Sequence, residues 1–150
     1  MALKLSTGLR DSLAVTGSLR AAISGGFIKV YSGIPPLTAD AAIGSAGTNT
    51  LLATISDNSG VGGLTFEATP SAGIIEKTIA QVWSGAVASS GTATFFRWVL
   101  TGDTGAGSTS AVRMQGLVAN LNAELNLANT TLVIAATQPI NHFFVAIPTP

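Results

Sequence analysis

Side chains that could do acid–base or metal chemistry are few and scattered in this chain of 150 residues. There is one histidine, His142, beside Phe143 and Phe144, and there is no cysteine. A zinc site needs three or four ligands drawn from His, Cys and carboxylates, and a thiolate nucleophile or a disulfide needs cysteine. The carboxylates are also spread along the chain: Asp11, Asp40, Asp57, Glu67, Glu76, Asp103 and Glu124. We therefore expect no metal, no cofactor and no catalytic residues.

Two glycine-rich segments do not fit the pattern of a phosphate-binding loop. The stretch "GDTGAGS" (102–108) lacks the Gly-Lys-Ser/Thr ending, and "SGVGG" (59–63) lies between predicted strands instead of opening a helix. We interpret both as turns in which glycine tolerates a positive φ.

The segment "FFRWVL" (95–100) is apolar on both faces when it is interpreted as a strand. Phe96 and Trp98 point to one side, whereas Phe95, Arg97 and Val99 point to the other. An arginine among aromatic residues is typical of an interface core, so these last three residues are our interface candidates. The alternative is that the N-terminal helices cover this face within the chain. Arg97 would then need a carboxylate or several carbonyls to offset its desolvation.

The chain carries little charge, and this excludes several classes of partner. Only 9% of its residues are charged, against about 25% in an ordinary domain, and seven basic side chains balance seven acidic ones. Without a basic cluster, we expect neither nucleic acid nor a membrane surface as a partner. No apolar run reaches the roughly 20 residues of a membrane span, and Arg10 and Asp11 interrupt any secretion signal. Low charge with a net charge near zero favours self-association.

The first 26 residues have helix signals. Ser6 or Thr7 can cap a helix that Gly17 ends, and Ser18 can cap a second helix that Gly25 and Gly26 end. We therefore predict two short helices, or one helix broken at Gly17, and treat residues 1–26 as a helical N-terminal arm or lid.

From residue 27 onward, alternating apolar and polar residues predict short strands. The alternation is cleanest over 117–127, where an amide-rich face is expected to point to solvent. The predicted fold class is mainly β: an antiparallel, jelly-roll-like β-sandwich with a short helical N-terminal segment, and a β-barrel is the main alternative. Residues 27–150 are predicted to form one sandwich domain. The expected strands lie in 27–33, 51–56, 64–68, two within 74–88, 92–100, 117–127, 130–136 and 141–147.

An ordered series of stretches carries a family resemblance over nearly the whole chain. They include "MALKLSTGLR", "GSLRAAISGGFIKVYSG", "TLLATIS", "GLTFEA", "AQVWSGAVASSGTATFFRWV" and "GDTGAGST". In this order they resemble small virion structural proteins of tailed bacteriophages. The resemblance implies a structural role, most specifically a capsid decoration (cement) protein clamped on the outside of the head. It implies no catalytic residues.

The expected function is therefore to bind the major capsid protein outside the head and to reinforce contacts between its subunits. We expect a dimer or trimer that is not an enzyme, located on the capsid surface of a virion assembled in the host cytoplasm. One alternative is a tail, baseplate or head-fibre component. Another is a carbohydrate-binding jelly-roll module that contacts the host surface. Asn120, Asn122, Glu124 and Asn126 offer polar groups for such a site, but the sequence places no aromatic residue near them.

Overall fold

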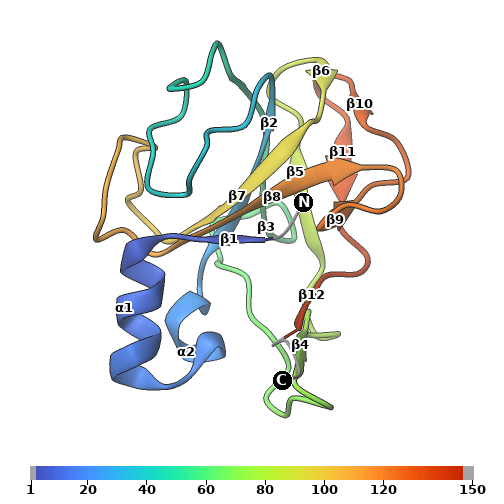
Figure 1. The fold of residues 1–150 in the computed structure, drawn as a ribbon. Helices are drawn as coiled ribbons and strands as arrows, with labels where there is room; N and C mark the ends of the chain where they lie inside the picture. Colours follow the sequence, from blue (N-terminus) through green and yellow to red (C-terminus); the bar gives the residue numbers. More distant parts are fainter. Residues whose placement is uncertain (1–2, 147–150) are drawn as a thin grey trace.

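A computed structural model describes residues 3–146, and its fold is mainly β with antiparallel sheets and short N-terminal helices (Figure 1). The strands are β1 (Lys4–Leu5), β2 (Phe27–Ser32), β3 (Thr50–Asp57), β4 (Ile74–Glu76), β5 (Trp83–Ala86), β6 (Gly91–Thr92), β7 (Phe95–Val99), β8 (Arg113–Ala119), β9 (Leu125–Asn126), β10 (Thr131–Leu132), β11 (Thr137–Pro139) and β12 (Phe144–Ala146). The main sheet has the order β1-β8-β7-β2-β3-β5-β11, with β9 beside β8. Strands β6 and β10 form one small sheet, and β4 and β12 form another.

The structure has two helices, with the predicted N-caps Ser6 and Ser18 and the predicted stop at Gly17, but the second helix ends at Ser24 and not at Gly25-Gly26. Helix α1 (Thr7–Thr16) begins where the Ser6 side chain accepts a hydrogen bond from the Leu9 amide, and it ends at Gly17, which has φ 66°. Helix α2 (Leu19–Ile23) begins at Ser18, whose side chain accepts from the Ala21 amide. Within residues 3–146, no helix is long and apolar enough to cross a membrane.

The N-terminal segment packs directly on the β-strands. Strand β1 pairs with β8, while Leu9 of α1 and Ile23 of α2 are fully buried. The indole nitrogen of Trp98 in β7 donates to the Ile23 carbonyl at 3.1 Å. Residues 4–23 therefore share the core of the β-strands, as a lid does.

The main core lies on the face of β7 that carries Phe96 and Trp98. Phe66, Trp83 and Phe143 join them there, with neighbouring ring centroids 5.1 to 6.3 Å apart. Offset and edge-on packing at these separations adds to the energy of burial. The core thus joins the main sheet to the shorter β4–β12 sheet and to the segment around residue 66.

The cleanest alternation in the sequence does not form one strand. Strand β8 ends at Ala119, and the chain turns through Asn122, which has φ 59°. Two residues, Leu125 and Asn126, then pair parallel to β8. The Asn120 amide donates to the carbonyls of residues 127 and 128, so it stabilises this turn instead of lining an outer strand face.

Two other predicted strands are also shorter than expected. Residues 64–68 form only isolated bridges, and of residues 130–136 only Thr131–Leu132 are in a strand. Pro139, which lies between two of the expected strands, is part of β11 at the edge of the main sheet. An edge position suits proline, because it has no amide to offer to a further strand.

Gly85 allows β5 to approach β3, and its replacement tests this close packing. A Cβ at residue 85 would overlap the Thr54 carbonyl oxygen. We expect Gly85→Ala to lower the free energy of unfolding by about 1–3 kcal/mol, the usual cost of overpacking. The matched control is Gly62→Ala, whose Cβ would meet only Asp57 Cβ at an ordinary 3.5 Å. Equal urea midpoints for the two variants would contradict the packing described here.

Candidate functional site

The three interface candidates lie inside the protomer. The exposed fractions of Phe95, Arg97 and Val99 are 0%, 0% and 2%. The structure therefore corrects the expectation that this face is open to a partner, since the chain covers the face itself. The cover differs from the alternative considered above, because α2 packs on the opposite face, beside Trp98. Two loops, residues 33–49 and 100–112, supply it instead.

A row of polar side chains crosses the sheet on this covered face. The strand register places Lys4, Gln115, Arg97 and Lys29 opposite one another on β1, β8, β7 and β2. Directly opposed residues of antiparallel strands lie close enough for their side chains to interact. Arg97 Nε and Nη2 donate to Gln115 Oε1 at 3.2 and 2.6 Å. Several hydrogen-bond donors therefore lie side by side on this face, and Arg97 and Gln115 are joined directly.

Three residues of this row, with Arg113 beside them, bind the backbone of residues 36–41, which have no regular secondary structure. Arg97 donates to the carbonyls of residues 41 and 38 at 2.9 and 3.5 Å, and Gln115 Nε2 donates to that of residue 36 at 2.7 Å. Lys4 Nζ reaches the carbonyl of residue 37 at 2.9 Å, and Arg113 Nη1 reaches that of residue 39 at 3.4 Å. Buried carbonyls need partners, and here the side chains of the sheet provide them.

A buried ion pair binds the second loop. Arg113 Nε and Nη2 donate to the two carboxylate oxygens of Asp103 at 2.6 and 2.8 Å, and their side chains are only 2% and 5% exposed. Burial alone would raise the pKa of Asp103, but the hydrogen bonds from Arg113 and from the Gly105 amide hold that pKa below its ordinary value. Lys29 Nζ also donates to the Asp103 carbonyl at 3.0 Å. The glycine-rich loop is thus an anchored cover and not a simple flexible turn.

The electrostatics of the cluster favour a structural role. Burial, followed by repulsion from Arg113, lowers the pKa of Arg97 to about 10, so its guanidinium stays charged at neutral pH. Within residues 3–146, no three His, Cys, Asp or Glu side chains are grouped so as to hold a metal ion. The Nε, Nη1 and Nη2 atoms of Arg97 each donate to an amide or carbonyl oxygen of the same chain. Such an arrangement holds loops in place.

All seven basic side chains of the sequence donate within the chain. Six of them reach backbone carbonyls: Lys4, Arg20, Lys29, Lys77, Arg97 and Arg113. The seventh, Arg10, donates to Thr7 Oγ1. The basic residues therefore help to hold loops and turns of the chain itself.

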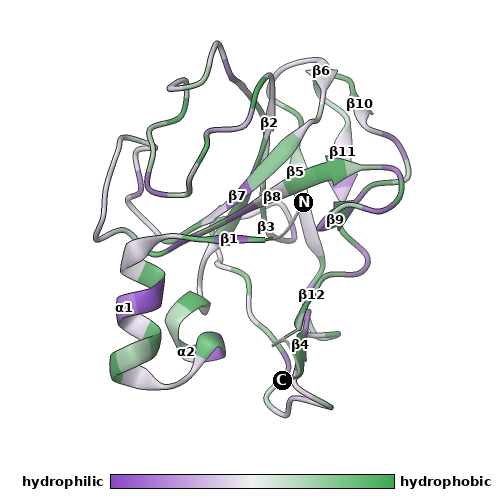
Figure 2. Cartoon of the chain, in the orientation of Figure 1, coloured by the Kyte–Doolittle hydropathy of each residue, from purple (hydrophilic) through white to green (hydrophobic). Residues whose placement is uncertain are grey.

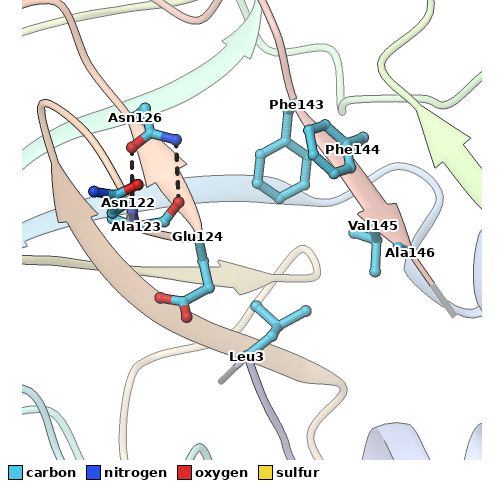
Figure 3. Close-up of a pocket in the computed structure, with 9 residues that line it drawn as sticks. All are labelled: Leu3, Asn122, Ala123, Glu124, Asn126, Phe143, Phe144, Val145 and Ala146. Carbon is cyan, nitrogen blue, oxygen red and sulfur yellow. Dashed lines mark hydrogen bonds between the residues drawn. The ribbon is translucent and has the colours of Figure 1, made fainter. Parts of the chain in front are cut away.

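A groove lies between the 122–126 segment and β12 (Figure 3). Its volume is about 350 Å³, and Asn122 and Glu124 line one wall while Phe143 and Phe144 line the other. Phe144 is 61% exposed, whereas Phe143 is buried in the core. An aromatic residue near these polar groups could not be predicted from the sequence, because about twenty residues separate Phe144 from Asn122 and Glu124 and only the fold brings them together.

Exposed apolar side chains are numerous elsewhere on the surface. Eleven large ones are exposed within residues 3–146: Leu5, Val15, Ile34, Leu37, Val61, Ile79, Val82, Leu121, Val133, Ile134 and Phe144. Seven of them come from α1, the β2–β3 loop, the segment after β4 and the β10–β11 connection, which lie on different sides of the molecule in Figure 1. Figure 2 shows hydrophobic stretches in these surface loops as well as in the strands.

Comparison with known proteins adds no relative. No family model, no curated protein and no solved structure matches the chain.

Arg97 is expected to be essential for folding. Arg97→Glu places a carboxylate among the carbonyls of residues 38 and 41, so we expect a loss of at least about 3–5 kcal/mol, as when a buried charge loses its partners. That loss is comparable with the whole stability of many domains. Urea unfolding followed by tryptophan fluorescence measures it, with the exposed Arg10→Glu as the control. A folded Arg97→Glu protein of normal stability would show that the covered face is described wrongly.

The Asp103–Arg113 pair predicts a specific acid dependence. Because the native pKa of Asp103 lies below the unfolded value of about 3.9, its contribution is complete above that value and disappears as the pH falls through the native pKa. At neutral pH we expect Asp103→Asn to cost up to about 3–5 kcal/mol, and the cost to shrink steadily towards about pH 2. The control is Asp11→Asn on the exposed face of α1. A cost for Asp103→Asn that does not change with pH would contradict the ion pair.

Proposed function

We propose that this chain is a capsid decoration protein that binds the major capsid protein on the outside of a phage head and reinforces contacts between its subunits. The observation that carries the proposal is the number of exposed apolar side chains on a charge-poor surface, on several sides of the fold. Exposed apolar side chains that gather in patches mark sites of association, and three surface segments each carry two of them: Ile34 and Leu37, Ile79 and Val82, and Val133 and Ile134. A protein seated where several subunits meet needs such contacts on more than one side. The family resemblance of the sequence supports the same role.

The internal use of the basic side chains supports binding through apolar contacts. Interactions between exposed charges weaken as salt screens them, whereas apolar burial does not depend on charge. Since Arg97 and Arg113 are buried and Lys4 and Lys29 donate to loop carbonyls, few charges remain to steer or weaken docking. A protein of this kind would hold its partner over a wide range of ionic strength.

Repetition on a lattice makes modest contacts sufficient. A standard interface buries about 800 Å² on each partner, and much of its gross energy is offset by lost freedom of motion. Each single contact can therefore be of ordinary affinity. Self-association as a dimer or trimer, which we include in the proposal, would let one oligomer touch several capsid subunits and gain from avidity.

Imaging of intact particles tests the proposal directly. We expect density for this chain in many copies over the head shell, with the β2–β3 loop or the β10–β11 connection against the major capsid protein. The face of β7 that carries Arg97 is expected to make no contact with a partner. Density restricted to the tail, baseplate or head fibres would refute capsid decoration and support the structural alternative.

A further inference from the structure

Three hollows meet around the exposed side chain of Phe144. The groove in Figure 3 has a volume of about 350 Å³, and two neighbouring hollows have volumes of about 300 and 260 Å³. All three share Phe143 and Phe144 as lining residues. Each hollow alone is near or below the lower limit of ordinary ligand pockets, which is about 300 Å³. Together they form an open trough on both sides of one aromatic ring.

The rim of this trough carries polar groups that the fold does not use. Asn122, Asn141 and His142 line the hollows, and their side chains make no hydrogen bond within residues 3–146. A primary amide can donate two hydrogen bonds and accept two, and a neutral imidazole can donate one and accept one. The hollows lined by Phe144 therefore also carry side-chain donors and acceptors.

The charges on the rim disfavour an anionic ligand. Glu124 and Glu76 line the trough and repel anions. Glu124 is also held in place, because its Oε2 accepts from the Leu117 amide at 2.8 Å. The basic residue of the rim, Lys77, directs its Nζ to the carbonyls of residues 78 and 81. Phosphate and nucleotide ligands are thus unsuited to this site.

We infer that the Phe144 trough binds a neutral oligosaccharide. A sugar ring has an apolar face of C–H groups, which can stack on an aromatic ring, and a rim of hydroxyls, which pair with amides, imidazole and carboxylate. Phe144 supplies the stacking surface, and Asn122, Asn141 and His142 supply partners for the hydroxyls. An open trough of several small hollows suits successive sugar units better than one compact molecule.

The fold also supplies the aromatic residue that a saccharide site needs and that the sequence did not place near the polar groups. Asn122 and Glu124 offered polar groups without an aromatic partner in the sequence, and the fold places Phe144 across the groove from them (Figure 3). The inference does not depend on capsid decoration, because the site lies within one protomer. On a virion, such a site would let the chain contact a saccharide surface.

The test uses the purified full chain on an array of bacterial surface oligosaccharides, with titration calorimetry against the strongest ligand. We expect at least one neutral saccharide to bind, Phe144→Ala to weaken that binding at least tenfold, and Asn141→Ala to weaken it by a few fold. Phe144→Tyr keeps the ring and should retain binding. The control is Ile34→Ala, which removes an apolar side chain of nearly equal exposure (62%, against 61% for Phe144) from the β2–β3 loop and should bind as the parent does.

Several outcomes would overturn the inference. Binding to no saccharide, or equal binding by Phe144→Ala and its parent, excludes a saccharide site at this position. If Phe144→Ala instead abolishes attachment to purified capsids and no saccharide binds, the trough is a protein contact, which supports the proposed function and refutes this inference. Thermal unfolding of each variant confirms that Phe144→Ala remains folded, as expected for a side chain exposed on β12.

Discussion

The carbonyl groups of residues 36–41 impose the constraint on which much of this structure depends. This loop makes no strand or helix, yet it lies over a sheet face on which Arg97 is fully buried. Backbone carbonyls in such a position must find donors. Long side chains on three neighbouring strands provide them, and the Arg97–Gln115 contact at the centre fixes the direction of both side chains. The Arg97 guanidinium in turn donates to carbonyls of this loop. Neither the buried guanidinium nor these carbonyls would therefore have their hydrogen-bond partners without the other.

The second loop completes the same arrangement. Asp103 neutralises Arg113, and the two loops are joined where the Ile43 amide donates to the Gly105 carbonyl and the Ser108 amide donates to the Asp40 carbonyl. Asp40 also accepts from the first residue of α1 through Thr7, which connects the cover to the N-terminal helices. The two buried charges, Arg97 and Arg113, are therefore used to hold these loops, while large apolar side chains are exposed at the surface. This distribution is what favours association over catalysis in the proposed function.

The predictions from sequence succeeded where the signals are local. The caps Ser6 and Ser18 and the stop at Gly17 are decided by neighbouring residues, and the helices formed as predicted. The alternation over 117–127 failed because a left-handed Asn122 and the side-chain bonds of Asn120 favour a turn. The alternation of side chains along the strand correctly placed Arg97 and Trp98 on opposite faces of the sheet. It could not show which residues cover Arg97.

That cover had no signal in the sequence because the acceptors are carbonyls, which every residue has. About sixty residues separate Arg97 from the loop that accepts its hydrogen bonds. The same reason explains why Phe144 could not be connected with Asn122 in advance. The requirement that a buried Arg97 needs several carbonyls was, however, a correct physical expectation. It indicates that an arginine in an apolar strand is evidence of a polar cover, whether from the chain itself or from a partner.

Hydrogen exchange of backbone amides in the dilute protomer tests this account most directly. If the loops cover the β7 face from within one chain, the amides of Ile43 and Ser108 will be strongly protected, and the protection will not change with protein concentration. Exchange at the rate of an exposed loop, with protection that arises only when copies associate, would contradict the account and return Phe95, Arg97 and Val99 to a subunit interface.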